Sequence, residues 1–367
     1  MPKPLNGLKV LSMAEQYPGP YATLLLADLG ADVILIERPG MGDPARQFPS
    51  FFAALNRNKR SVGIDLKSDS GRDALKRLVE TADIFLEGFR PGTMKRLGLD
   101  YESLSALNPR LIYASISGFG QEGPYRDRPA HDLSYQGMAG FLFRDAETGI
   151  PPERAPDVAV GDLSSGMFAA VGVLSAVIQR ASTGRGCFVD VAMTDGLVSW
   201  MSVYLGAVLN GETPADIGAE PAYRSYACGD GKLITLSIAH EDWFWDPFCK
   251  VVGLDDAVGL KRPDRVARTK ELSARIDAAL KAKPRDEWGA LFDTKGVPWG
   301  PVLSLKEVTE DPNFRARNLF REVAGERHVA QPLTFDGDHP GPERPMPKLG
   351  EHTDEVLSQA GIARETA

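Results

Sequence analysis

The stretch L-K-V-L-S-M-A-E-Q-Y-P-G-P-Y-A-T-L-L-L-A-D-L-G-A-D-V-I-L-I-E, residues 8–37, decides the fold class. Residues 8–12 are a short apolar run typical of a buried strand, and residues 21–29 have the composition of a helix opened by a Pro-Gly-Pro turn. Residues 32–37 are a second apolar strand. Strand, helix and strand within about 30 residues make a βαβ unit, which predicts a parallel sheet.

The same pattern continues along the chain. Residues 71–81 are amphipathic, and strand-like apolar runs follow at residues 82–87, 111–116 and 187–192. We therefore expect an α/β protein with a doubly wound, Rossmann-like large domain. Its first turn, E-Q-Y-P-G-P, lacks the G-x-G-x-x-G pattern that cradles a pyrophosphate, which argues against a nicotinamide cofactor.

A second domain is predicted after residue 200. Residues 201–220 contain Gly, Pro and Asp residues typical of a linker. Beyond them, Gly229-Asp230-Gly231 lies between two strand-like runs and predicts a hairpin, and helical segments follow. The expected domains are a large Rossmann-like domain over 1–200, completed by a segment at about 325–367, a linker over 201–220, and a smaller α+β domain over 221–324.

Composition narrows the class of protein. The 367 residues include 42 Lys and Arg and 50 Asp and Glu, a formal net charge of −8, which argues against a general nucleic-acid binder. No long apolar run or signal-peptide pattern is evident, so we expect a cytoplasmic protein that neither spans nor binds a membrane. The three cysteines and five histidines are scattered, so neither a disulfide framework nor a metal site is predicted.

Two titratable residues lie at the start of segments rich in small apolar residues. His131 lies in R-P-A-H-D-L-S-Y-Q-G and Asp162 in V-G-D-L-S-S-G-M-F. Asp162 is expected to be the N-cap of a largely buried helix, where it is either a structural cap or a group beside free N–H donors that can hold an oxyanion. His131 is either a satisfied histidine before a helix or a proton-transfer group. The helix after Asp162 is predicted from the helical spacing of four apolar residues: Met167, Val171, Leu174 and Ile178.

A basic cluster occurs in this acidic protein. Residues 56–67, N-R-N-K-R-S-V-G-I-D-L-K, place four cations in twelve positions. Two interpretations remain open at this point: a solvated charged loop, or a phosphate site in which Arg supplies paired donors and Lys a point charge. Loops over 88–92 and 117–125 follow predicted strands, and ligands of open α/β sheets bind outside the carboxyl ends of strands. We expect the cluster, these loops and His131 to converge.

Several motifs occur in order along essentially the whole chain: G-A-D-V-I-L-I-E-R-P-G at 30–40, the basic segment at 56–67, E-G-F-R-P-G at 87–92, S-I-S-G-F-G-Q-E-G-P-Y at 115–125 and the segment around Asp162. With these motifs the chain resembles the class III CoA-transferase (CaiB/BaiF) family, which includes formyl-CoA and carnitine CoA-transferases and the α-methylacyl-CoA racemases. The resemblance implies a CoA thioester as the ligand, with no cofactor beyond that CoA. It also implies an interlocked homodimer, with each active site between the large domain of one subunit and the small domain of its partner.

The resemblance also implies roles for particular residues. In the transferases, the aspartate that matches Asp162 is a nucleophile that forms an aspartyl anhydride. In the racemases it is one of two bases, paired with a histidine that matches His131, and the Asp162 helix N-terminus would supply donors to the enolate. Glu241 falls where the racemases have a supporting carboxylate. The residues that match CoA-contacting positions are Arg38, Lys59, Ile64, Asp65, Leu66, Lys67, Gly88, Phe89, Arg90 and Arg96.

Three features favour the racemase branch: the H-D-x-x-Y pattern at 131–135, Glu241, and the lack of a glycine run around 237–241. We therefore expect epimerisation of the α-carbon of a 2-methylacyl-CoA by two-base proton transfer through an enolate. The alternative is CoA transfer between carboxylic acids through an anhydride at Asp162. A third possibility is a non-catalytic partner that only binds CoA esters.

Overall fold

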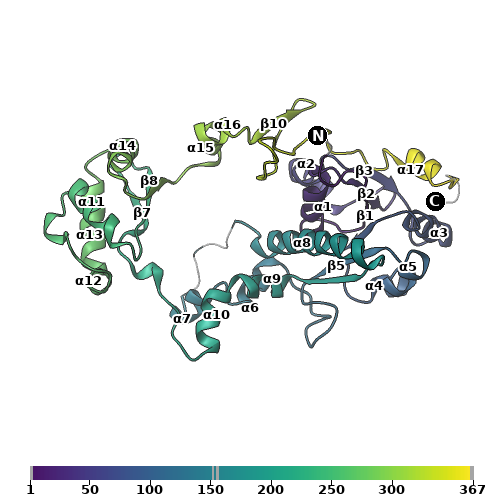
Figure 1. Ribbon diagram of the computed structural model, residues 1–367, viewed down its shortest axis with the longest axis horizontal. Coiled ribbons are helices and arrows are strands. Elements are labelled where there is room, and N and C mark those ends of the chain that lie inside the picture. Colours follow the sequence, from purple (N-terminus) through teal and green to yellow (C-terminus); the bar gives the residue numbers. More distant parts are fainter. Residues whose placement is uncertain (1–2, 151–152, 154–156, 364–367) are drawn as a thin grey trace. The chain divides into compact units, whose positions relative to one another are not determined.

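The computed structural model of this protein describes residues 3–150, 153 and 157–363 (Figure 1). The two ends of the expected large domain, residues 1–2 and 364–367, lie outside these residues.

The chain forms two compact units, each described by itself. Unit 1 comprises residues 1–203 and 316–367, and unit 2 comprises residues 204–315. Unit 2 is therefore an insertion between two parts of unit 1. The division falls at 204 and 316, compared with expected boundaries of the small domain at 221 and 324.

Unit 1 is built on a six-stranded parallel sheet with the order β3-β2-β1-β4-β5-β6. This is the Rossmann order, in which the direction of winding reverses between β1 and β4. The prediction of a parallel α/β sheet is confirmed. The strands are β1 (Lys9–Ser12), β2 (Asp32–Glu37), β3 (Arg60–Gly63), β4 (Ile84–Glu87), β5 (Ile112–Ser117) and β6 (Phe188–Ala192).

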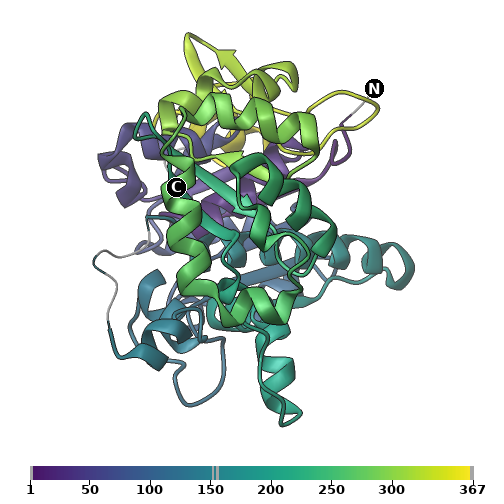
Figure 2. The same ribbon diagram turned by 90° about the vertical axis from the view of Figure 1, so that its left-hand side faces the viewer.

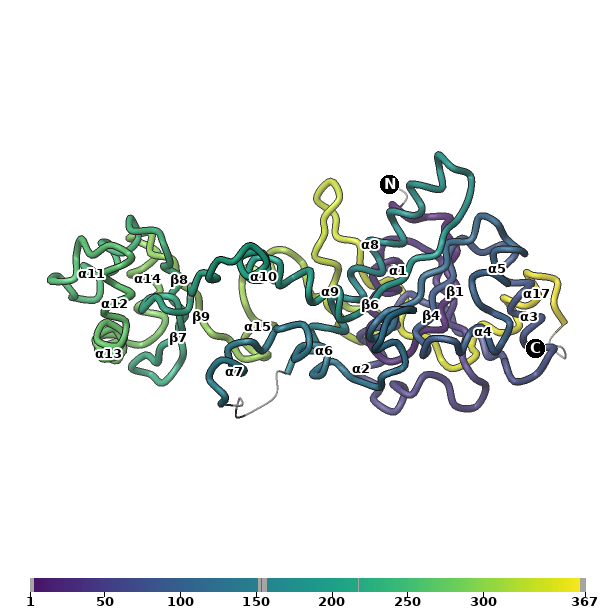
Figure 3. The backbone as a smooth tube through the Cα atoms, turned by 90° about the horizontal axis from the view of Figure 1, so that it is seen from below, coloured from purple at the N-terminus to yellow at the C-terminus, as the bar shows by residue number. Residues whose placement is uncertain are grey.

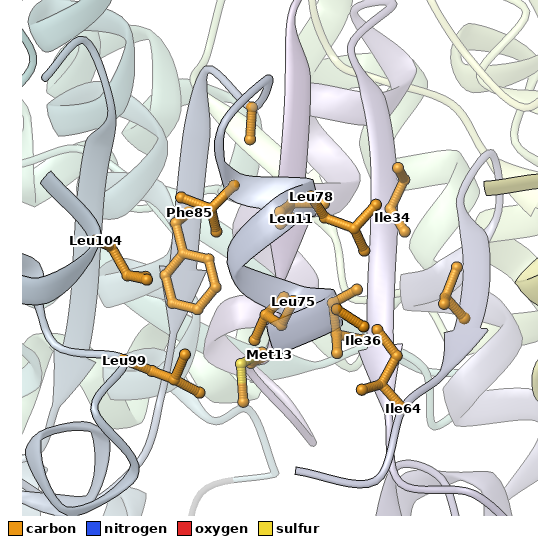
Figure 4. Close-up of a cluster of buried hydrophobic side chains, with 14 of the residues drawn as sticks. Leu11, Met13, Ile34, Ile36, Ile64, Leu75, Leu78, Phe85, Leu99 and Leu104 are labelled. Carbon is orange, nitrogen blue, oxygen red and sulfur yellow. The ribbon is translucent and has the colours of Figure 1, made fainter. Parts of the chain in front are cut away.

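Helices cover both faces of this sheet. On one face, α3 packs Leu75 and Leu78 against strand residues such as Phe85, and α5 and α17 extend the same core (Figure 4). On the other face, α1 and α8 pack against the sheet (Figure 1). The helices of this unit are α1 (Pro18–Asp28), α2 (Pro49–Asn56), α3 (Asp69–Val79), α4 (Thr93–Leu97), α5 (Tyr101–Leu107), α6 (Asp132–Met138), α7 (Phe143–Thr148), α8 (Val160–Thr183), α9 (Met193–Trp200), α10 (Ser202–Leu209, at the boundary) and α17 (Thr353–Gln359).

Helix α8 is long and apolar enough to cross a membrane by length and composition alone, but its inner face packs on α1 and the sheet as a core helix does. The expected burial of its large apolar stripe is wrong: Met167, Val171 and Ile178 are 46%, 58% and 75% exposed. Small residues form the buried face instead, because the two helices approach closely. A Cβ at Gly166 would lie 2.7 Å from the carbonyl oxygen of Pro18.

Helix α1 begins three residues earlier than the expected helix at Tyr21. Pro18 occupies its first turn, where the missing N–H costs no hydrogen bond. Gly19 is required there, because a Cβ at this position would lie 2.0 Å from the Cβ of Ala14. The loop between β1 and α1 is therefore short and close to the sheet.

Unit 2 has its own core around Trp245, Phe248 and Phe292. Strands β7 (Tyr223–Ala227) and β8 (Leu233–Ser237) form the predicted hairpin, and β9 (Trp299–Pro301) adds an antiparallel third strand. Figures 2 and 3 show the helices of this unit in green beside these strands. They are α11 (Asp242–Val252), α12 (Arg262–Ala267), α13 (Thr269–Leu280), α14 (Arg285–Lys295) and α15 (Leu305–Glu310), followed by α16 (Pro312–Ala316) at the boundary.

The C-terminal segment returns to unit 1. Strands β10 (Phe320–Val323) and β11 (Glu326–Val329) form a hairpin, and helix α17 follows near the end of the described residues. The segment closes the β3 edge of the sheet: the His352 N–H donates to the Ser61 carbonyl at 2.9 Å, and the Gly63 N–H to Thr353 Oγ1 at 3.0 Å.

Candidate active site

A cavity of about 560 Å³ opens in unit 1 at the carboxyl ends of β1, β4, β5 and β6. Ligands of doubly wound sheets bind at this edge, beside the reversal of strand order. A larger cavity of about 810 Å³ in this unit shares Tyr17 with the first but contains none of the predicted site residues. The walls of the smaller cavity come from residues 15–18, 88–91, 116–119, 126–131, 134, 135, 162 and 193.

Asp162 lies in the first turn of α8 and faces this cavity half-buried. The expectation that it is the N-cap is wrong. The N-cap is Ala159, so Asp162 is the third helical residue. This position leaves the carboxylate available for chemistry.

The cap of α8 comes from Asp132 on the neighbouring helix α6. Asp132 Oδ1 accepts the N–H groups of Gly161 at 2.7 Å and Asp162 at 3.2 Å. Gly161 permits this approach, since a Cβ there would lie 2.8 Å from the same oxygen. The two amides are thus already bonded, so the helix N-terminus does not supply the oxyanion donors that we expected.

Burial raises the pKa of Asp162 from 3.8 to about 7, and the nearby negative charge of Asp132 adds to this effect. The pKa of Tyr17 is also raised, first by burial and then by the charge of Asp162, which places both groups in one electrostatic environment. A carboxylate that titrates near neutrality in a cleft is a candidate for a catalytic group.

His131 lines the same cavity and is exposed. It is the N-cap residue of α6, but its side chain makes no capping hydrogen bond. The structure therefore brings together His131 and Asp162, the two residues around which the chemistry was predicted.

Glu241, the third predicted catalytic residue, lies in unit 2 as the N-cap residue of α11. Its Oε2 accepts the Ala239 N–H at 3.0 Å and lies 3.9 Å from His240 Nδ1. The side chain is tied within its own turn.

Most residues predicted to contact CoA follow the carboxyl ends of β2, β3 and β4; β2 and β3 are neighbours in the sheet, and β1 lies between β2 and β4. Arg38 and Lys67 are exposed there, and Gly88, Phe89 and Arg90 line the cavity. The exposed Arg96 donates to Thr93 Oγ1 at 3.0 Å. The remaining members of this exposed edge are Asp65 and the half-buried Leu66.

Two predicted contacts are wrong as side-chain contacts. Lys59 is 2% exposed, and its Nζ donates to the Pro20 carbonyl, Thr23 Oγ1 and Asn56 Oδ1 at 2.8–2.9 Å. The side chain of Ile64 is 1% exposed and belongs to the core under α3 (Figure 4). Both side chains are buried inside unit 1 and are not presented at the exposed edge.

The interpretation of residues 56–67 as a phosphate site is largely wrong, because most of its cations are used inside the protein. Arg57 pairs with the buried Asp28 at 2.6 Å. Arg60 pairs with Asp32 at 2.5 Å and with Glu355 at 3.0 Å. Lys67 is the remaining cation of the segment that is exposed at the strand edge.

Other residues of the cavity were not foreseen. Arg126 and Arg128 join Arg90 in its walls, and the Arg128 guanidinium lies 5.4 Å from the centre of the Tyr125 ring. Three arginines in the walls of one cavity suit an anionic substrate. Their position in the loop before His131 was the available signal, but isolated arginines in a loop are usually solvated.

Several known proteins are similar to this chain over nearly its whole length. A profile described as CoA-transferase family III matches residues 5–353. The acetyl-CoA:oxalate CoA-transferase of Acetobacter aceti is 34% identical over 95% of this chain and 93% of that protein. The succinate–glutarate CoA-transferase of Agrobacterium fabrum is 35% identical over 99% of this chain and 97% of that protein. The crystal structure of a CaiB/BaiF family protein from Brucella suis has a TM-score of 0.87 at 32% identity, covering 98% of this chain and 100% of that chain.

These findings support the CoA-transferase alternative better than the racemase interpretation, because the relatives are named for CoA transfer. The non-catalytic interpretation is wrong, since the family consists of enzymes. The mixed α/β fold with its parallel six-stranded sheet matches that of the CaiB/BaiF protein. The chain is an enzyme and belongs to CoA-transferase family III.

Proposed function

We propose that this enzyme transfers coenzyme A from an acyl-CoA to a free carboxylic acid, with Asp162 as the nucleophile. The observation that carries the proposal is the half-buried Asp162 carboxylate in a cavity with three arginines. Asp162 is not the N-cap of its helix, and Asp132 supplies the cap instead. The names of the relatives support the same reaction.

The steps follow from the chemistry of a carboxylate and a thioester. Asp162 attacks the thioester carbonyl, and the C–S bond breaks. CoA leaves as a thiolate, and the acyl group remains on Asp162 as a mixed anhydride. The thiolate then attacks the aspartyl carbonyl, releases the donor acid and leaves an aspartyl thioester. The acceptor carboxylate attacks this thioester to form a second anhydride, and the thiolate attacks the new acyl carbonyl. The product acyl-CoA forms and Asp162 is restored.

We propose a dicarboxylic acid as the acceptor. The relatives are named for oxalate, glutarate and mesaconate, which all carry two carboxyl groups. One carboxylate must reach Asp162, and Arg90, Arg126 and Arg128 in the walls can pair with the other. A guanidinium binds a carboxylate through two parallel N–H donors, so this pairing also orients the acid.

Coenzyme A is proposed to lie along the strand edge that leads into the cavity. Arg38, Lys67 and Arg96 present cations there for its phosphates, and the loop over 88–90 continues to the cavity. This path leaves Lys59 and Ile64 out of the binding site.

A homodimer is proposed as the working form. The exposed stripe of α8, made by Met167, Val171 and Ile178, is too apolar for a free surface. Exposed apolar residues continue into the following helices, notably Trp200 and Val203, at 43% and 79% exposure. A second copy of the chain is the partner that the family resemblance implies. In an interlocked dimer, Glu241 of one subunit would approach the Asp162 of the other.

Epimerisation of a 2-methylacyl-CoA is retained as a second candidate on one observation. His131 and Asp162 line the same cavity. The exposed imidazole of His131 makes no capping hydrogen bond, so it can accept or return a proton. The two candidates differ in what they need: transfer requires an acceptor acid and epimerisation does not.

One experiment tests CoA transfer and epimerisation together. The purified enzyme is incubated in deuterated water with succinyl-CoA or a 2-methylacyl-CoA, with and without oxalate, glutarate or mesaconate, and the products are identified by mass spectrometry. We expect CoA on the added acid, and hydroxylamine should trap residue 162 as a hydroxamate. Asp162→Ala should abolish both signals, whereas His131→Ala should retain transfer. Deuterium at the α-carbon without any acid, and no transfer, would establish epimerisation instead.

A further inference from the structure

A backbone outlier lies in the cavity wall. Gln16, in the loop after β1, has φ 65°, in the left-handed region that residues other than glycine rarely adopt. The loop over 15–18 forms one wall of the cavity that contains Asp162. Strained residues persist only where the surroundings hold them, so the contacts of Gln16 identify what holds this wall.

The group that holds Gln16 is Asp43. The Gln16 N–H donates to Asp43 Oδ2 at 3.0 Å and to Oδ1 at 3.2 Å. Asp43 is 5% exposed, and its Oδ1 also accepts the Ala45 N–H at 2.8 Å. Asp43 itself does not line the cavity.

Asp43 is in turn anchored to the sheet. Its N–H donates to Glu37 Oε1 at 3.0 Å, and Glu37 ends strand β2. The Glu37 carboxylate is held by Arg46 through Nε at 2.8 Å and Nη2 at 2.6 Å, and by the Ser61 hydroxyl of β3 at 2.5 Å. A continuous chain of buried and partly buried hydrogen bonds therefore runs from two strands of the sheet to the left-handed residue in the cavity wall.

We propose that Asp43 is a positioning residue for CoA transfer, which holds Gln16 in its left-handed conformation and so fixes the wall over 15–18 relative to Asp162. The inference rests on the proposed function. Its physical basis is that an acyl group reacts well only when the wall that orients it is placed to within a fraction of an ångström. Without Asp43, Gln16 is expected to relax to negative φ, and the loop should move away from its present position.

The first test compares two aspartates that both accept an N–H at the start of a helical turn. Asp43→Ala should lower kcat for CoA transfer by about tenfold or more and change KM by less than about twofold, because the binding edge is intact. Asp43→Asn should restore most of kcat, since one amide oxygen can still accept both N–H groups. Asp100→Ala, which removes the N-cap of α5, should leave kcat near that of the wild type.

The second test asks whether Asp43 acts through Gln16. Glycine adopts positive φ without strain, so in a Gln16→Gly background Asp43→Ala should cost less than about twofold in kcat. The same fold-loss in both backgrounds would overturn the proposal, as would an unchanged kcat for Asp43→Ala. If Asp43→Ala alone fails to fold, the double variant should fold, and failure of the double variant would also overturn it. A wild-type enzyme without transfer activity would instead refute the proposed function.

Discussion

In the proposed mechanism Asp162 is the nucleophile, and the titration of its carboxyl gives a direct prediction. Its pKa of about 7 means that the nucleophilic carboxylate forms as the pH rises through neutrality. We expect kcat for CoA transfer to rise with pH up to about 8 and to level off above it. Stopped assays across this range measure the profile, and a kcat that falls with increasing pH would contradict a carboxylate nucleophile.

The same pKa has an opposite effect on stability. Because the folded-state pKa of Asp162 is raised, its contribution to stability is complete below the unfolded pKa and is lost as pH rises through about 7. Asp162→Asn should therefore stabilise the fold by roughly 2 kcal/mol at about pH 8, after allowance for partial solvent screening, and by little near pH 4. Denaturant titrations at both pH values check this, with Asp145→Asn on the exposed helix α7 as the control.

Two lysines of the basic segment should behave in opposite ways. Lys59→Met leaves three buried acceptors without a donor, so it should destabilise the fold by roughly 2–3 kcal/mol while the KM for CoA esters stays unchanged. Lys67→Met should leave stability within about 0.5 kcal/mol of the wild type but weaken binding of CoA esters, more so at low salt. Urea unfolding and calorimetric titration with a CoA ester separate the two effects, and the reverse pattern would place Lys59 in the binding site.

At the residue scale the sequence predicted which groups meet, but not how they are used. His131 and Asp162 lie at one cavity, as their similar settings suggested. The roles of Lys59 and Arg57 were misjudged because a run of cations has the same appearance whether it is solvated or paired internally. Pairing with Asp28, a residue far away in sequence, becomes visible only in the fold.

At the scale of elements, the contact between α6 and α8 sets the properties of the site. Asp132 caps α8 and raises the pKa of Asp162 through its charge. Asp132→Asn keeps an oxygen for the cap but removes the charge, so the pH profile of transfer should shift to lower pH. Asp132→Ala also removes the cap and should destabilise α8 by about 1 kcal/mol. A profile that does not move in either variant would remove Asp132 from the electrostatics of the site.

Elements were predicted best where a single pattern dominates. Five of the six parallel strands follow from their apolar runs, whereas β3 (Arg60–Gly63) was recognised only as part of a basic cluster, with a charged loop and a phosphate site as the two interpretations. Its burial depends on ion pairs and on the C-terminal segment, which local sequence does not reveal. The helical period of α8 was recognised correctly, but its large residues face outward, since contact with α1 selects small residues on the inner face.

At the scale of the whole molecule, that outward face yields a test of assembly. Val171→Glu combined with Ile178→Glu puts two charges on the exposed stripe of α8 and should convert a dimer to a monomer in sedimentation velocity. Leu107→Glu on α5, which is 44% exposed, provides a control that should remain dimeric. An unchanged dimer would place the interface elsewhere, and a wild-type monomer would contradict the proposed assembly.

The insertion of unit 2 between two parts of unit 1 bears on synthesis. A ribosome completes residues 204–315, which have their own core, before it makes the segment that bonds to Ser61 and Gly63. The nascent chain therefore carries a finished smaller unit while the β3 edge of the larger sheet still exposes unpaired N–H and carbonyl groups. Such edges recruit other strands, so the interval before the last 50 or so residues emerge is when a chaperone has most to protect.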